Sequence, residues 1–423
     1  MAQNFPPTLW ELIQCWSRIG LLSFGGPAAQ IGLMHQEIVT RKKWLEEDEF
    51  NNALAFCMLL PGPEAMQLAT YMGWKLRGIL GGVITGLLFI LPGAVIVGAL
   101  SFLYLYFGST EIAENAFMGL KSAVVVIVFH ALFKLAARSV ETTTKTVISL
   151  LSFVLLFCFQ IPFALLLGSV VGFALLFSQS QPTPSKAHFP SDPTNVVRIG
   201  LIWLGIWIGP ILMMMLFFPD NILTSLALFF SKLAVFSFGG AYAVLAYMSQ
   251  EVVHLNNWLT AQSMIDGLGL AETTPGPLIL VTEFVGILTA AQMYPEQQVF
   301  YGIAGGIVTL WATFVPCFLW IFVGAPYLDW INTHPKFKAV SGLISAAIVG
   351  VILNLTVWFT FNVFFEQTFQ ISFWIANLTL PNVGTLLPLP IAIAMLAFVL
   401  YSLIGMLTTF AICAILPIII IWF

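Results

Sequence analysis

The stretch SFGGPAAQIGLMHQEIVTRKKWL, from Ser23 to Leu45, returns later in the chain as SFGGAYAVLAYMSQEVVHLNNWL, from Ser237 to Leu259. The Ser-Phe-Gly-Gly start, the Gln-Glu pair and the Trp-Leu end all recur at a separation of 214 positions. Pro61-Gly62-Pro63 recurs at the same separation as Pro275-Gly276-Pro277. An ordered series of matches at one offset indicates that the chain is an internal duplication.

The duplicated motifs lie in a chain with the composition of a membrane protein. Of its 423 residues, 59% are hydrophobic and only 8% are charged, against roughly a quarter charged in a soluble domain. Apolar runs of about 20 residues or longer recur, which is enough for a helix to cross a hydrocarbon core of about 30 Å. These runs include Gly78–Phe107, Ala113–Leu135, Val196–Phe218 and Leu386–Phe423. The five cysteines lack metal-ligand spacing, so we expect neither a metal nor a cofactor, and no cleavable signal peptide is visible.

A polar stretch, SQSQPTPSKAHFPSDPTN at 178–195, separates the two copies. Its prolines and serines do not continue a membrane helix, so we interpret it as a linker. The apolar run at 196–218 has no counterpart before the linker. The predicted organisation is therefore an N-terminal membrane repeat at 1–177, the linker, a connecting transmembrane helix at 196–218 and a C-terminal membrane repeat at 219–423.

The distribution of Lys and Arg indicates that the second copy is inverted, because short cytoplasmic loops are enriched in these residues. The first copy carries Arg41-Lys42-Lys43, and the equivalent loop at 254–257 carries no Lys or Arg. Conversely, the loop at 107–114 is acidic, whereas its counterpart carries Lys336 and Lys338. The connecting helix at 196–218 adds one extra membrane crossing, so the second copy enters the membrane from the opposite side. Inverted repeats with a binding site at their interface are a recurring design of secondary transporters.

We expect residues 46–74 to form a re-entrant hairpin with Pro61-Gly62-Pro63 at its tip. Basic residues flank the segment on both sides, so the chain enters and leaves on one face. Its arms of about 12 to 14 residues are short for a crossing, and the prolines interrupt helical hydrogen bonding. A proline kink in a packed helix is the alternative, which the recurrence of the motif disfavours. The sequence leaves open whether residues 8–34 form one span or a second hairpin.

The glycine motifs and three cations form a candidate anion site. Glycine permits close approach of a ligand, and free N–H groups at a helix start attract anions, although close helix packing also explains a glycine pair. Arg18 and Lys232 precede the two Ser-Phe-Gly-Gly motifs by five residues. The alternative for these two side chains is that they snorkel to opposite membrane interfaces. The predicted substrate-binding residues are Arg18, Ser23, Phe24, Gly25, Gly26, Pro61, Gly62, Pro63, Gln67, Lys121, Lys232, Ser237, Gly239, Gly240, Pro275, Gly276 and Pro277.

Carboxylates beside the Pro-Gly-Pro motifs are candidates for proton coupling. Glu64 directly follows the first motif and Glu272 precedes the second. Capping of a half-helix or pairing with a cation explains them equally well. Glu283 and His130 are further candidates, although a His on an apolar helix also fits a hydrogen-bonded core residue.

The chain resembles the chromate ion transporter family in its long, two-domain form. The resemblance covers nearly the whole chain and rests on SFGGPAAQIG…EIVTRKKWL, LLPGPEAMQLATYMGW, FSFGGAYAVL and GLGLAETTPGPL. It implies export of chromate from the cytoplasm, driven by the proton-motive force, with sulfate as the chemical analogue. The chain departs from the family at Gln30, where many relatives have His, and at Glu283, where an uncharged residue is expected.

Together these features predict an all-α polytopic membrane protein with two homologous inverted-topology repeats and broken or re-entrant helices at the Pro-Gly-Pro motifs. The expected function is proton-coupled secondary transport that exports chromate across the bacterial inner (plasma) membrane, without nucleic-acid partners. A transporter for sulfate or another anion, an anion channel and an intramembrane enzyme are the alternatives. The absence of H-E-x-x-H, G-x-S-x-G and nucleotide-loop motifs disfavours an enzyme or a primary pump. The sequence leaves a homodimer open.

Overall fold

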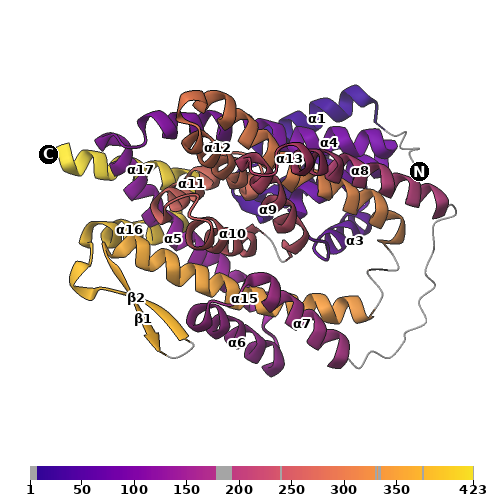
Figure 1. Ribbon diagram of the computed structural model, residues 1–423. Coiled ribbons are helices and arrows are strands. Elements are labelled where there is room, and N and C mark those ends of the chain that lie inside the picture. Colours follow the sequence, from indigo (N-terminus) through magenta and orange to yellow (C-terminus); the bar gives the residue numbers. More distant parts are fainter. Residues whose placement is uncertain are drawn as a thin grey trace. The chain divides into compact units, whose positions relative to one another are not determined.

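The computed structural model describes residues 7–177, 193–238, 241–328, 331, 335–373 and 376–422, and most of them are helical (Figure 1). The helices before the linker are α1 (Leu9–Leu22), α2 (Gly26–His35), α3 (Glu47–Cys57), α4 (Glu64–Phe107), α5 (Glu111–Ser139), α6 (Thr143–Phe159) and α7 (Phe163–Phe177). The helices after it are α8 (Pro193–Phe217), α9 (Ile222–Phe236), α10 (Ala241–Ser249), α11 (Ala261–Thr273), α12 (Val281–Met293), α13 (Gln298–Gly324), α15 (Pro335–Phe364), α16 (Pro388–Ile404) and α17 (Met406–Trp422).

Five helices in the described ranges are long and apolar enough to cross a membrane. They are Glu64–Phe107, Glu111–Ser139, Thr194–Phe217, Pro295–Tyr327 and Ala339–Phe364. The outer face of α4 is lined by exposed Leu80, Leu91 and Val95, at spacings that place them on one side of a helix. An exposed apolar stripe of this kind is costly in water and suited to lipid. The prediction of an all-α polytopic membrane protein is therefore confirmed.

The two copies fold into the same order of elements. A short helix, a break at Ser-Phe-Gly-Gly and a second short helix are followed by π-helical turns at Gln36–Arg41 and Gln250–Leu255. Lys43 and Asn257, at matched positions after these turns, both adopt a positive φ, near 50°. A hairpin then follows in each copy, made by α3 and α4 in the first and by α11 and α12 in the second. Matching backbone conformations confirm that the halves are structural repeats.

The return arm of the first hairpin is only the beginning of α4. Arg77 and Gly78 have non-helical backbone angles, with φ at 65° in Gly78, so the helix breaks there. Glycine is the residue that adopts this conformation without steric strain. The arm from Glu64 to this break is therefore as short as the sequence predicts, and the long apolar helix starts after it.

Two features differ from the expected pattern. The apolar run at 386–423 does not form one helix, because Gly405, at φ 81°, separates α16 from α17. Residues 359–382, in a chain predicted to be all-α, contain the end of α15 and an antiparallel hairpin of β1 (Thr368–Phe373) and β2 (Ala376–Pro381). Local periodicity cannot reveal such a hairpin in a short loop, where apolar and polar residues alternate only briefly.

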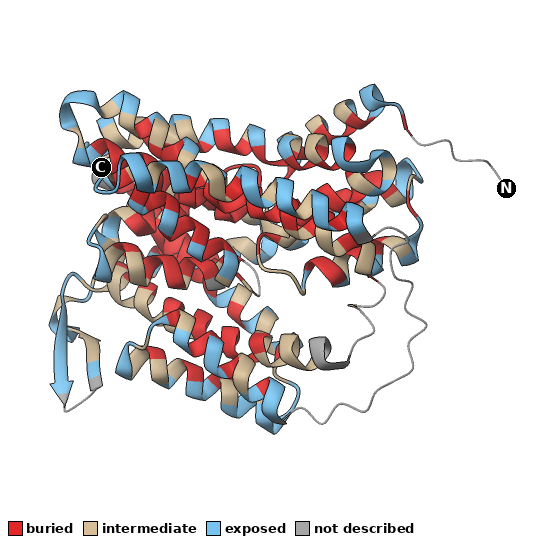
Figure 2. Ribbon diagram, turned by 45° about the vertical axis from the view of Figure 1, so that its right-hand side comes forward, coloured by how far each residue is buried: buried red, intermediate tan, exposed pale blue. Residues whose placement is uncertain are grey.

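The described chain forms two compact units, and each draws segments from both repeats. The first unit contains 1–102, 180–241 and 274–338, and the second contains 103–179, 242–273 and 339–423. In the first unit α13 packs against α8, α9 and α12; in the second, α5 packs against α11, α16 and α17. Buried residues run through the helices of each unit, and exposed residues mark their outer faces and the β hairpin (Figure 2).

Candidate functional site

Each Pro-Gly-Pro turn is hydrogen-bonded to the Ser-Phe-Gly-Gly motif of the other repeat. The Gly62 N–H donates to the carbonyl of Ser237 at 2.8 Å. The Gly276 N–H donates to the carbonyl of Ser23 at 2.9 Å and to its hydroxyl at 3.0 Å. All four residues belong to the first unit. The motifs that recur in the sequence therefore form two equivalent contacts between the repeats, both within the first unit.

The turn chemistry explains why these residues form the contact. Proline has no N–H, so glycine carries the only backbone donor of each Pro-Gly-Pro turn. Gly62 and Gly276 have φ of 119° and 93°, a region in which glycine is unstrained. Packing is also tight, because a Cβ added to Gly93 of α4 would overlap the carbonyl of Pro275. Both the donor and the space at this site depend on glycine.

Two buried glutamines hold the carbonyls of the turns. The amide of Gln67 donates to the carbonyl of Pro61 at 2.6 Å, and that of Gln30 donates to the carbonyl of Gly276 at 2.6 Å. Neither side-chain oxygen has a hydrogen-bond partner among the described residues. These buried oxygens are acceptors for a water or a protonated ligand. Gln67 was predicted from the sequence, whereas Gln30 was noted there only as a departure from the family.

The start of α2 offers a second element of an anion site. Gly25, at φ 94°, occupies the N-cap, and no side chain caps the first turn. The unpaired N–H groups and the helix dipole make such an end favourable for a negative charge. Gly239 and Gly240 of the second motif lie outside the described residues. The corresponding end of α10 therefore adds nothing here.

The three predicted cations lie in different surroundings. Arg18 on α1 and Lys232 on α9 are exposed, so the structure does not bring them into the buried motif cluster. Lys121 on α5 is buried, and its ammonium lies 3.1 Å from the carboxylate of Asp266 on α11. Asp266 was not predicted from the sequence, although an acidic residue within the apolar run 264–271 was a signal for it. A role of Arg18 and Lys232 in binding the substrate stays a prediction.

The predicted proton-coupling residues are also separated. Glu64 begins α4, where a carboxylate interacts favourably with the helix dipole. Glu283 on α12 is buried beside Gly98 and Gly306, and one of its oxygens has no hydrogen-bond partner among the described residues. In the second unit, buried Glu272 accepts a hydrogen bond from Tyr242 at 2.9 Å. His130 is exposed; its ring contacts Tyr401.

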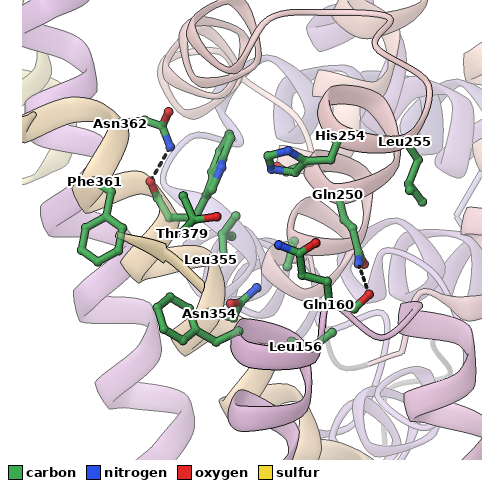
Figure 3. Close-up of a pocket in the computed structure, with 14 residues that line it drawn as sticks. Leu156, Gln160, Gln250, His254, Leu255, Asn354, Leu355, Phe361, Asn362 and Thr379 are labelled. Atoms are coloured by element: carbon green, nitrogen blue, oxygen red, sulfur yellow. Dashed lines mark hydrogen bonds between the residues drawn. The ribbon is translucent and has the colours of Figure 1, made fainter. Parts of the chain in front are cut away.

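A polar pocket of about 130 Å³ lies in the second unit (Figure 3). Side-chain amides of Gln160, directly after α6, of α15 and of the π-helical turn after α10 line it, together with the imidazole of His254. The amide of Gln250 donates to the carbonyl of Gln160 at 3.4 Å, and that of Asn362 donates to the carbonyl of Trp358 at 2.8 Å. Partial removal from water lowers the pKa of His254. No local pattern in the sequence indicates this pocket, because its lining residues are far apart in the chain.

Within the described ranges, no three His, Cys, Asp or Glu residues gather as metal ligands would. The arrangement instead offers backbone N–H groups, amides and one buried ion pair. Groups of these kinds are suited to binding a polar solute.

Comparison with known proteins identifies relatives across most of the chain. It is 29% identical to a probable chromate transport protein of Synechococcus elongatus, over 83% of this chain and 84% of that protein. It is also 29% identical to a chromate transport protein of Cupriavidus metallidurans, over 83% of this chain and 82% of the relative. An uncharacterized transporter of Methanocaldococcus jannaschii is 26% identical over 85% of this chain and 86% of its own. No solved structure matches the chain.

The family comparison covers both repeats. Residues 10–176 and 224–422 each match the chromate transporter family, and the linker and the whole of α8 lie outside the match. These two regions contain both Ser-Phe-Gly-Gly motifs and both Pro-Gly-Pro turns that meet in the first unit. The chain therefore belongs to the chromate transporter family.

Proposed function

We propose that this protein is a proton-coupled secondary transporter that exports chromate, or a related dianionic oxyanion, across the plasma (inner) membrane. The observation that carries the proposal is the pair of joints in which each Pro-Gly-Pro turn contacts the Ser-Phe-Gly-Gly motif of the other repeat. Irregular backbone inside a membrane protein survives where it is buried in protein or lines a cavity for a solute. Two such joints, related by the repeat, fit a binding site between repeats.

The joints are weak enough to open and close. Each consists of one or two hydrogen bonds, and a hydrogen bond of this kind contributes about 0.5–1.5 kcal/mol net. Opening a joint releases the glycine N–H as a donor for an oxyanion, beside the hydroxyl of Ser23 or Ser237. The uncapped start of α2 adds a positive helix end. Alternate opening of the two joints would expose the oxyanion first to one side of the membrane and then to the other.

The choice of chromate follows the named relatives, two of which are described as chromate transport proteins. Sulfate has the same charge and tetrahedral shape, and is therefore the natural competitor. Buried carboxylates such as Glu272 and Glu283 support coupling to protons, because a carboxylate kept inside a membrane protein is costly without a function.

Transport into inside-out vesicles tests this function directly. Vesicles containing the protein should accumulate labelled chromate when a proton-motive force is imposed, and unlabelled sulfate should compete. Vesicles without the protein are the control. Failure to take up chromate under any gradient, with the protein folded and inserted, would exclude the substrate.

We also infer that the repeats have opposite orientations in the membrane. Cysteines placed at Trp44 and Trp258, which are matched positions, should be labelled from opposite faces by an impermeant maleimide. Four of the five native cysteines are buried, so Cys158→Ser is a suitable background. Labelling of both sites from one face would contradict the inverted arrangement.

A further inference from the structure

A buried ion pair in the second unit is reinforced by a tyrosine. The Lys121 ammonium lies 3.1 Å from Oδ1 of Asp266, and the Tyr104 hydroxyl donates to Oδ2 at 2.9 Å. The side chains of the lysine and the aspartate are 8% and 6% exposed. Three elements, α4, α5 and α11, therefore contribute one group each to a charged cluster enclosed by protein.

The position of Lys121 excludes snorkelling. Residues 121–128 of α5 are all buried, so the helix has no exposed face at this level. Lys121 lies ten residues after the start of α5, or about 15 Å along its axis, well beyond the acidic first turn. Gly269, one turn after Asp266, lies against Leu120 of α5. This close approach holds the aspartate beside the lysine.

We propose that Lys121, in the second unit, is an oxyanion-binding group in addition to the joints of the first unit. Asp266 holds Lys121 until the carboxylate takes up a proton, so that proton and oxyanion bind together. The inference rests on the proposed transport function and specifies how it is coupled. A proton adds to Oδ1 of Asp266, the oxygen that faces Lys121, and gives a neutral acid. The ammonium is then a buried charge without compensation, which is strongly unfavourable until an anion replaces the carboxylate. Departure of the oxyanion reverses the sequence, and the proton leaves Asp266.

Few other charged or titratable groups face this pair. Glu114 on α5 is near enough to repel the Asp266 carboxylate, and Tyr104 donates to it. The other helices that pack on α5 are α16 and α17. Their described residues include only Tyr401 and Cys413 as titratable groups. The charge of the cluster is therefore set mainly by Lys121 and Asp266.

Because the proton and the oxyanion bind together, the direction of coupling is fixed. A dianion that travels with one proton carries a net charge of minus one, so an inside-negative membrane potential drives it out of the cell. Acid on the cytoplasmic face then promotes binding. Exchange of an entering proton for a leaving oxyanion would show the opposite response to a pH gradient.

Inside-out vesicles with a clamped membrane potential test the inference. Chromate uptake is measured while the outer pH, which bathes the cytoplasmic face, is lowered and the lumenal pH is fixed. The wild-type rate at low chromate should rise with acid, by at most about tenfold per pH unit for one proton per anion. In Asp266→Asn this response should be lost, and any dependence that remains belongs to the protonation of chromate itself. Glu141→Gln, which removes the exposed Lys145–Glu141 pair, is the matched control and should respond like the wild type.

A double variant distinguishes this coupling role from a purely structural role of the Lys121–Asp266 pair. The double variant Lys121→Gln/Asp266→Asn removes both charges and should fold even if Asp266→Asn alone does not. We expect it to lose chromate transport while keeping the wild-type elution profile in detergent. Wild-type transport with an unchanged pH response in the double variant would overturn the inference. So would stimulation of the wild type by an acidic lumen, or loss of the response in Glu283→Gln but not in Asp266→Asn. In each of these cases chromate uptake itself, and hence the proposed function, would stand.

Discussion

Replacement of Gly62 by alanine separates the contribution of the joint from that of backbone strain. The residue has φ of 119°, and an added Cβ would lie 2.6 Å from Nε2 of Gln67 and 3.1 Å from Sγ of Cys317. The new methyl therefore displaces the amide that donates to the carbonyl of Pro61, and it shifts the N–H that donates to Ser237. Gly405 has φ of 81° and no atom within 4 Å of such a Cβ. Gly405→Ala is thus a control with strain but without a joint.

The expected magnitudes follow from these contacts. A positive φ outside the left-handed helical region costs an alanine about 1–3 kcal/mol, and this cost applies to both variants. Gly62→Ala also loses two hydrogen bonds of about 0.5–1.5 kcal/mol each, which brings its total to about 2–6 kcal/mol. The difference in the free energy of unfolding between the variants is then about 1–3 kcal/mol.

Two measurements check this prediction. Thermal unfolding in detergent, followed by tryptophan fluorescence, should show a lower midpoint for Gly62→Ala than for Gly405→Ala. Chromate uptake should fall strongly in Gly62→Ala and remain near the wild-type rate in Gly405→Ala. Equal losses of stability and transport in both variants would refute the idea that the joint contributes anything beyond backbone strain.

Three further predictions concern single residues of the repeats. Ser23→Ala removes an acceptor of the Gly276 N–H and should cost about 1 kcal/mol and part of the uptake rate, whereas Ser237→Ala should cost less, because among the described residues the Ser237 hydroxyl bonds only to the carbonyl of Ala234 in α9; equal effects would contradict the asymmetry. Lys43→Gly should stabilise the protein against thermal unfolding by up to about 1 kcal/mol, because lysine has a positive φ at this position. Asn257→Gly should stabilise it by less, because asparagine tolerates a positive φ better than lysine. A loss of stability in Lys43→Gly would show that the contacts of the lysine side chain outweigh the backbone strain. Gly93→Ala should lower the unfolding midpoint by the equivalent of about 1–3 kcal/mol, because its methyl overlaps a carbonyl of the second Pro-Gly-Pro turn, and an unchanged midpoint would mean that α4 can move aside.

The buried and exposed cations show where reasoning from sequence reaches its limit. Arg18, Lys121 and Lys232 are each a single positive charge in an apolar segment, and the pattern of neighbours does not distinguish them. The structure does, because Lys121 is enclosed and paired with a carboxylate, whereas Arg18 and Lys232 are exposed. Its partner lies 145 positions away in the chain, beyond the reach of any local pattern.

The duplication, the membrane-spanning character and the helix breaks at glycine and proline were determined by the sequence alone. These features are local or repetitive: hydrophobicity decides what enters a membrane, and missing N–H groups or positive φ decide where a helix ends. The two hairpins could therefore be predicted with their arms and tips.

Only the tertiary structure decided which breaks meet. Gly62 contacts the motif of the other repeat at Ser237, and Gly276 contacts Ser23, so the repeats are joined crosswise and not each within itself. It also decided that the compact units mix segments of both repeats, and it placed Asp266 beside Lys121. The physical reason is that a repeated motif reveals equal local conformations, whereas partners are chosen by packing among segments that are distant in the chain.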